Sequence, residues 1–190
     1  MKKTRKELHV RKKRMFRMLL LANSLAAFSI GLFTPFYYLF IRDFGGGIET
    51  FGIALGLMLL AQSLTYYFAG RFSDKIGRKP LLVASALAFA VIIIAYTFIT
   101  ELWQLYALQI IFGIQQAVFI VSETSFLGDL TTKATRGRHI GLYSAIAGVL
   151  TALGMMVGGL FAKNFGTNFI FYFCSATVLL CVTLLVPIKE

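Results

Sequence analysis

Residues 70–80 read Gly70-Arg-Phe-Ser-Asp-Lys-Ile-Gly-Arg-Lys-Pro80 and stand between two long apolar runs. Gly70 and Gly77 let the backbone leave a helix and take a positive φ, and Pro80 suits the first turn of a following helix. The centre of the stretch is too polar to enter hydrocarbon, since it holds Asp74, Lys75, Arg78 and Lys79. The stretch therefore predicts a tight turn between two membrane-spanning helices.

The composition of the whole chain agrees with a membrane location. Hydrophobic residues make up 58% of the chain and charged residues 14%, against about 25% charged in soluble domains. A hydrocarbon core about 30 Å thick needs roughly 20 residues per helix. Six runs meet this requirement, at residues 16–41, 48–69, 81–99, 102–127, 140–162 and 169–186.

These runs predict an all-α integral membrane protein, a multi-pass six-transmembrane-helix bundle. We expect three parts along the chain: a basic cytoplasmic N-terminal segment at 1–15, the bundle at 16–187, and the start of a cytoplasmic linker at 188–190.

The basic residues are distributed unevenly along the chain. Of the 19 Lys and Arg, 17 lie before or at the very start of the first span, in the second and fourth loops, or after the sixth span. All these segments fall on one side of a six-span protein, and an excess of Lys and Arg marks the cytoplasmic side. Both termini are therefore expected on the cytoplasmic side of a plasma or bacterial inner membrane. Membrane lipid is the partner that explains the net charge of +11, and no nucleic acid is expected.

A shift of 89 residues aligns the quoted turn with a second one. Gly70-Arg-Phe-Ser-Asp-Lys-Ile-Gly77 then faces Gly159-Leu-Phe-Ala-Lys-Asn-Phe-Gly166. One turn lies inside and the other outside in this topology, and only the inner copy is rich in charge. The alignment predicts that the bundle is a 3+3 inverted repeat.

The order of glycines and charges in residues 70–80 resembles the loop between the second and third membrane helices of the major facilitator superfamily. The resemblance covers essentially the whole chain but only half of that family's architecture, in which two six-helix bundles enclose the substrate. It implies transport of a small-molecule substrate by alternating access, with proton-coupled efflux as one form. The implied partner is a missing C-terminal six-helix half or a second half-size chain.

The same resemblance implies a conformational gate on the cytoplasmic side. Asp129 opens a loop that resembles the family's loop between the fourth and fifth spans. In the family, the matching acids and base form a charge cluster. The gate residues are expected to be Gly70, Asp74, Gly77, Arg78, Lys79 and Asp129.

Polar residues recur on one face of two of the predicted spans. In the fourth span, Gln109, Gly113, Gln116 and Glu123 follow at spacings of four, three and seven. Such spacings put them on one stripe of a helix, and lipid penalises a polar stripe. Spans 1 and 4 line the central cavity in superfamily folds. The candidate proton or substrate residues are Asn23, Thr34, Tyr38, Gln109, Gln116 and Glu123. Hydrogen bonding between helices is the alternative role for the glutamines.

Glu123 is the acid that lies well within a span. A membrane-buried carboxyl group suits a carrier that loads and unloads a proton. The alternative is a structural acid near the interface that pairs with a basic loop residue.

Glycines of the fifth span permit close helix packing, at Gly148, Gly154, Gly158 and Gly159. The chain also departs from family patterns in two places. Gln109 stands where many members have Arg ahead of a glycine, and Met155 stands where drug antiporters often have proline. No transporter subclass is therefore assigned.

Other classes of membrane protein find little support. The two histidines, His9 and His139, lie in the basic tail and at a helix entrance, and the three aspartates lie in separate loops. Cys174 and Cys181 lack further ligands nearby and suit packing. We expect no enzyme, no cofactor and no metal. A non-transporting or half-size protein that acts as a scaffold or through dimerisation remains the alternative.

Overall fold

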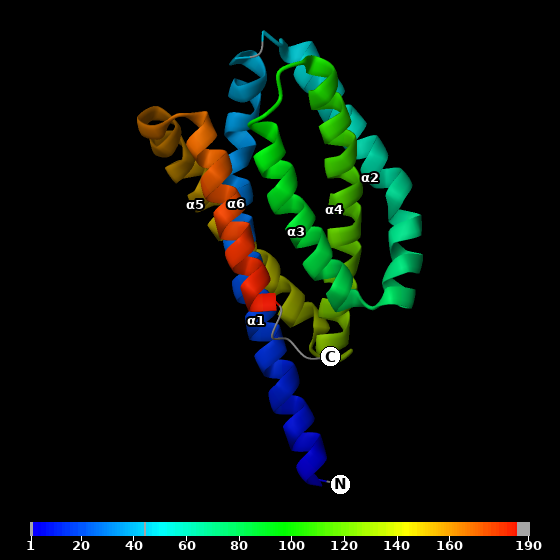
Figure 1. Cartoon of the computed structure of the whole chain (residues 1–190). Coiled ribbons are helices and arrows are strands. Elements are labelled where there is room, and N and C mark those ends of the chain that lie inside the picture. Colours follow the sequence, from blue (N-terminus) through cyan, green and yellow to red (C-terminus); the bar gives the residue numbers. More distant parts are fainter. Residues whose placement is uncertain (1, 44, 186–190) are drawn as a thin grey trace.

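The computed structural model describes residues 2–43 and 45–185 and contains six α-helices in this part of the chain. Each helix includes a stretch that is long and apolar enough to cross a membrane. Figure 1 shows them as one bundle, with α1 projecting beyond it at the N-terminus. The helices are α1 (Lys2–Asp43), α2 (Ile48–Ile76), α3 (Arg78–Tyr96), α4 (Leu102–Leu130), α5 (Arg136–Phe165) and α6 (Thr167–Leu185). The predicted linker at 188–190 and residues 186–187 lie outside the described residues.

Several helices extend further than the apolar runs that predict them. The first helix includes the basic segment from Lys2, and α2 continues to Ile76. Helical hydrogen bonds can continue past the hydrocarbon core, so hydropathy does not mark the helix ends. The third helix instead ends early, at Tyr96, where the Thr97 amide donates to the Ile94 carbonyl oxygen at 3.0 Å.

A single glycine forms the turn between α2 and α3. Gly77 has a φ of 101° and is both the last cap of α2 and the first cap of α3. Gly70, expected to end a helix as well, instead lies inside α2. Gly166 has a φ of 81° between α5 and α6. It is the position that the shift of 89 residues pairs with Gly77, so the two aligned turns share a left-handed glycine.

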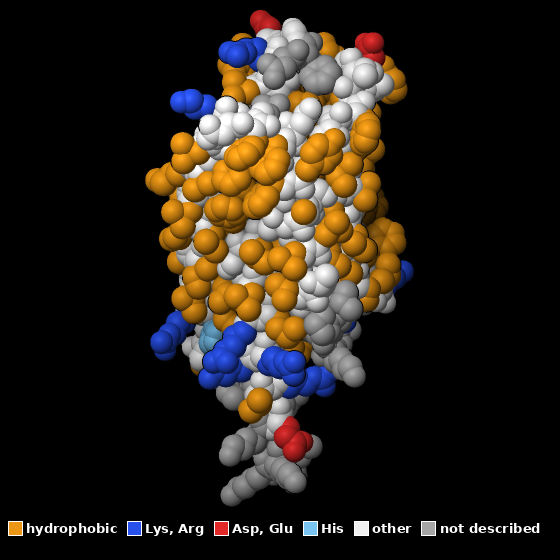
Figure 2. Space-filling model, turned by 60° about the vertical axis from the view of Figure 1, so that its left-hand side comes forward, with side chains coloured by type: hydrophobic (Ala, Val, Ile, Leu, Met, Phe, Trp, Pro, Cys, Tyr) orange, Lys and Arg blue, Asp and Glu red, His pale blue; other side chains and the backbone are white. Residues whose placement is uncertain are grey.

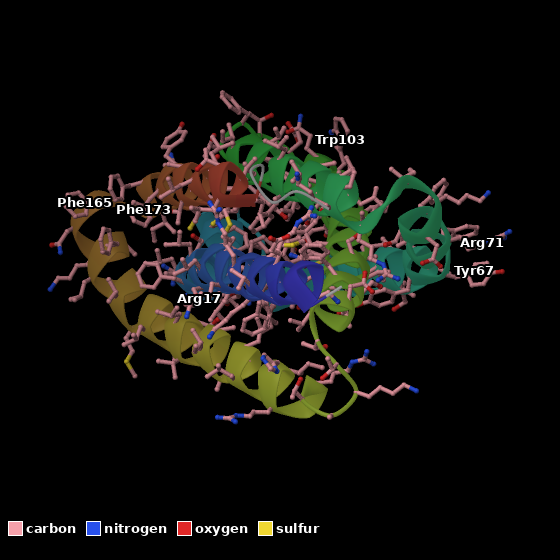
Figure 3. The ribbon with its side chains drawn as sticks, turned by 90° about the horizontal axis from the view of Figure 1, so that it is seen from below. Arg17, Tyr67, Arg71, Trp103, Phe165 and Phe173 are labelled. Carbon is pink, nitrogen blue, oxygen red and sulfur yellow. The ribbon has the colours of Figure 1, made fainter. Side chains whose placement is uncertain are left out.

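The packing of the helices follows the expected repeat. The most extensive contacts join α2 to α4 and α5 to α1, followed by α1 to α6 and α3 to α4. If α1, α2 and α3 are exchanged with α4, α5 and α6, respectively, the same four pairs of helices result. Figure 3, viewed along the bundle, places α2 and α5 at its outer edges, with the other helices between them.

Glycines make the two main crossings possible. A side chain at Gly31 of α1 would overlap the carbonyl oxygen of Thr151 in α5. A side chain at Gly113 of α4 would overlap the carbonyl oxygen of Met58 in α2. In each repeat of three helices, a glycine of the first helix thus packs closely against the second helix of the other repeat. Close approach of this kind is a common basis of helix packing in lipid.

Aromatic rings fill the interior near the end of the bundle that is remote from the N-terminus. Phe40 and Phe171 meet edge to face at 5.1 Å between ring centroids, and Tyr96 stacks on Phe171 at 5.9 Å. Outside, Figure 2 shows a broad apolar surface with basic side chains gathered at the end where α1 enters. This is the surface that a lipid bilayer requires of a bundle.

Candidate functional site

Three charged residues join the end of α4 to the turn between α2 and α3. The Arg78 guanidinium forms an ion pair with Asp129 and donates a hydrogen bond to the Ser125 carbonyl at 3.2 Å. Another guanidinium nitrogen lies 3.9 Å from the Asp74 carboxylate. The side chains of Arg78, Asp129 and Asp74 are 31%, 55% and 76% exposed. Water therefore screens these pairs, and the cluster can open at low cost.

Basic residues from two other segments reach the same end of α4. Lys12 donates to the Asp129 carbonyl at 2.7 Å, and Arg136 donates to the Gly128 carbonyl at 3.3 Å. The last carbonyls of a helix lack partners within it and favour cations. A pocket of about 420 Å³ adjoins the cluster, between α1, α4 and the turn at Gly77. The basic part of α1 is thus in contact with the predicted gate.

The remaining predicted gate residues flank the cluster. Gly77 forms the turn itself, Lys79 is the second residue of α3 and is half-buried, and Gly70 lies in the last two turns of α2.

A cleft of about 290 Å³ lies between α1, α2 and α4. Gln109 is 1% exposed, lines this cleft and donates a hydrogen bond to the Tyr37 hydroxyl. Among the described residues, its amide oxygen has no hydrogen-bond partner. Such an unpartnered oxygen is costly, and it is buried within the bundle beside the cleft. Most of the lining is aromatic and aliphatic, and it includes the polar side chains of Thr34, Gln62, Gln109 and Gln116.

The predicted polar residues divide between this cleft and a second cavity. Thr34 and Gln109 line the cleft, whereas Asn23 and Glu123 line a cavity of about 50 Å³ between α1, α3, α4 and α6. Gln116 lines both. Tyr38 is half-buried and meets the Phe51 ring edge to face at 5.5 Å, outside both sets of lining residues.

Glu123 contacts the fifth helix. The Tyr143 hydroxyl donates to a carboxylate oxygen of Glu123 at 2.6 Å. No Lys or Arg lies among the described residues that line the cavity with Glu123. The alternative role for Glu123, a structural acid paired with a basic loop residue, finds no such partner among the described lining residues.

The glycines of α5 fall into two groups. Gly154 and Gly158 are buried, and a side chain at Gly154 would overlap the Phe28 carbonyl of α1. Gly148 and Gly159 are exposed, with open space where a Cβ would be. In the described part of the chain, Cys174 and Cys181 are free and buried, and no three His, Cys, Asp or Glu gather as metal ligands.

Sequence patterns did not predict that Tyr37 pairs with Gln109 or that Tyr143 pairs with Glu123. Tyr37 lies three residues beyond Thr34 and so shares its helix face, which was a signal that spacing could have provided. Tyr143 stands in an apolar stretch with no such pattern. Its role becomes visible only when α5 is placed beside α4.

Comparison with known proteins gives a family match over most of the chain. The sequence model of the Major Facilitator Superfamily matches residues 19–190. The chain is 30% identical over 145 residues to YitZ, an uncharacterized MFS-type transporter of Bacillus subtilis. The aligned region covers 76% of this chain and 88% of that protein.

Two further relatives are named for drug resistance. The chain is 35% identical over 172 residues to the class H tetracycline resistance protein of Pasteurella multocida, covering 88% of this chain and 43% of that protein. It is 30% identical over 175 residues to multidrug resistance protein 2 of Bacillus subtilis, covering 91% and 44%. The chain thus spans less than half the length of these two relatives.

Proposed function

The chain belongs to the major facilitator superfamily, a family of multi-pass membrane transporters and not of enzymes, and we propose that it forms the N-terminal half of a secondary transporter. It resides in a plasma or bacterial inner membrane and exports a small solute by alternating access. The alignment with less than half of two drug-resistance proteins supports this role.

The observation that carries the proposal is the charge cluster of Asp74, Arg78 and Asp129. It links α4 to the turn between α2 and α3 through exposed ion pairs. Pairs of this kind hold one arrangement of helices and release when the helices move apart. The cluster acts as a latch that favours the state closed to the cytoplasm. Gly77 provides the turn, and Gly70 and Lys79 flank it.

The cargo is a small amphipathic compound. The cleft between α1, α2 and α4 presents aromatic rings, together with Thr34 and the amides of Gln62, Gln109 and Gln116. No charged side chain occurs among its described lining residues. Apolar walls with a few polar groups are typical of small-molecule sites. Thr34, Gln109 and Gln116 therefore contact the substrate, and Tyr38 supports α1 from the side of α2.

A second six-helix unit completes the cleft. The membrane stretches of α2 and α5 are only 6% and 11% buried, against 39–44% for the other four helices. Both helices expose glycines with open space beside them, namely Gly52, Gly56, Gly141, Gly148 and Gly159. These outer edges suit contact with a C-terminal half. A second copy of the chain on the same edges is the arrangement that a half-size dimer or scaffold would use.

The orientation is testable with single cysteines. Lys75 lies at the end of α2 and Asn164 near the end of α5, and both are exposed. With both termini in the cytoplasm, Asn164→Cys should react in intact cells with an impermeant maleimide. Lys75→Cys should react only after permeabilisation. The native cysteines, at 0% and 3% exposure, should stay unlabelled in both cases. Labelling of Lys75→Cys in intact cells would contradict this topology.

Export is testable in the organism that carries the gene. Deleting the gene should raise several-fold the accumulation of at least one compound from a panel of amphipathic fluorescent dyes and tetracycline. Restoring the gene should reverse the change, and an uncoupler that collapses the proton gradient should abolish the difference. Unchanged accumulation across the panel would argue for the scaffold alternative.

A further inference from the structure

The cavity that contains Glu123 is distinct from the substrate cleft. It has a volume of about 50 Å³ and lies among α1, α3, α4 and α6, whereas the cleft opens between α1, α2 and α4. Its walls are mainly aliphatic, and the polar side chains are those of Asn23, Gln115, Gln116 and Glu123. A space of this size holds one or two water molecules and no drug-sized compound. It is therefore suited to a small ion or a proton.

The neighbours of Glu123 give it one strong polar contact. Tyr143 of α5 donates to its carboxylate at 2.6 Å. The lining residues from α1 and α3 are not titratable, α6 contributes Cys181, and α2 contributes none. An ionised carboxylate in such surroundings has no counter-charge among the lining residues, and an unpaired charge within a membrane is costly. Binding a proton removes that cost.

The cavity and the cleft share part of their walls. Ile30, Phe89 and Gln116 line both the cavity and the cleft. Gln116 is the polar member of this shared wall, and its amide can donate and accept hydrogen bonds.

The hydrogen bond from Tyr143 also connects two helices that otherwise have little contact. The fifth helix packs on α1 and, to a lesser degree, on α6, and its contacts with α4 are few. The bond to Glu123 is thus a bridge between α4 and α5. A neutral carboxylic acid accepts a hydrogen bond more weakly than a carboxylate. Protonation of Glu123 therefore loosens the bridge.

We propose that Glu123 and Tyr143 form a proton-binding site inside this half, in which Tyr143 couples the protonation of Glu123 to the position of α5. The coupling to transport rests on the proposed function. The chemical step is the addition of one proton to one carboxylate, which gives the acid with no change in oxidation state. Tyr143 is a positioning residue that stabilises the ionised form.

Carbodiimide labelling tests the site without a transport assay. Dicyclohexylcarbodiimide dissolves in lipid and adds to carboxyl groups that carry their proton. The full chain in phospholipid vesicles, treated with this reagent from mildly acidic to mildly alkaline pH, should give an adduct at Glu123 that declines as the pH rises. Peptide mass spectrometry measures the labelled fraction. Glu49 and Glu101 are exposed and should remain unlabelled.

The tyrosine is tested by its effect on the pH profile. In Tyr143→Phe the carboxylate loses its donor, so labelling should persist to higher pH, by about one unit, which is tenfold in proton affinity. Tyr172→Phe is the matched control, because Tyr172 is 52% exposed on α6 and should leave the profile unchanged. Glu123→Gln should remove the adduct altogether.

Three results would overturn the proposal: no adduct at Glu123 at any pH, a labelled fraction that does not change with pH, or a Tyr143→Phe profile equal to that of the unmodified chain. The labelling profile could match the expectation while deletion of the gene leaves export unchanged. That result would support the proton site and would contradict its coupling to transport. The two proposals can therefore fail separately.

Discussion

Replacing Arg78 with Gln should lower export up to about fivefold, because exposed ion pairs contribute up to about 1 kcal/mol and such a loss in one conformation changes an equilibrium by about that factor. The Arg78 guanidinium holds Asp129, the Ser125 carbonyl and, more loosely, Asp74. Glutamine is neutral and too short to hold all three. The measurement is the initial rate of export of the compound identified by the gene deletion, normalised to the protein in the membrane.

The control for this prediction is another arginine of the same end of the bundle. Arg71 lies over the Tyr67 ring at 5.8 Å, and Figure 3 shows both side chains pointing away from the bundle. Arg71→Gln removes the same charge from the same end of the bundle and should retain export. The exchange of Arg78→Asp with Asp129→Arg should restore part of the rate. Equal losses in Arg78→Gln and Arg71→Gln would show that surface charge matters and the latch does not.

Replacing Gly31 with Leu should cost about 3 kcal/mol or more of stability, at or above the upper end for overpacked sites. The new side chain would overlap the backbone carbonyl of Thr151, which cannot rotate away as a side chain could. Since α1 and α5 form one of the two most extensive contacts of the bundle, their separation should prevent stable folding. The yield of monodisperse protein in detergent and its thermal unfolding midpoint measure the effect.

Gly148→Ala is the matched control on α5. A Cβ at Gly148 meets nothing within 4 Å. Alanine is favoured over glycine in a helix by about 0.5–1 kcal/mol, so this variant should fold at least as well as the unmodified chain. If Gly31→Leu folded equally well, the crossing of α1 and α5 as described would be wrong.

The number of spans and the position of the turn at Gly77 could be read from the sequence. Both follow from strong local signals: runs of apolar residues too long for a soluble protein, and a glycine where the backbone must take a positive φ. The polar face of α4 was also predictable, because Gln109, Gln116 and Glu123 contrast with apolar neighbours.

The partners across helices could not be predicted in this way. In a soluble protein the apolar face of a helix identifies its core side, but in lipid the outer face is apolar as well. Tyr143 stands among apolar residues, and nothing in its surroundings distinguishes the side facing Glu123. The contact of Lys12 with the end of α4 joins residues 117 positions apart and depends on a helix that begins at Lys2.

The exchanged packing of the two repeats has a consequence for biosynthesis. The principal neighbours of α1 are α5 and α6, so α1 lacks most of its packing partners until these two helices have been translated. A nascent chain arrested before Arg136 would hold α1 in the membrane with its glycine face uncovered. Membrane chaperones and quality-control proteases should therefore meet an open intermediate until α5 and α6 have entered the membrane.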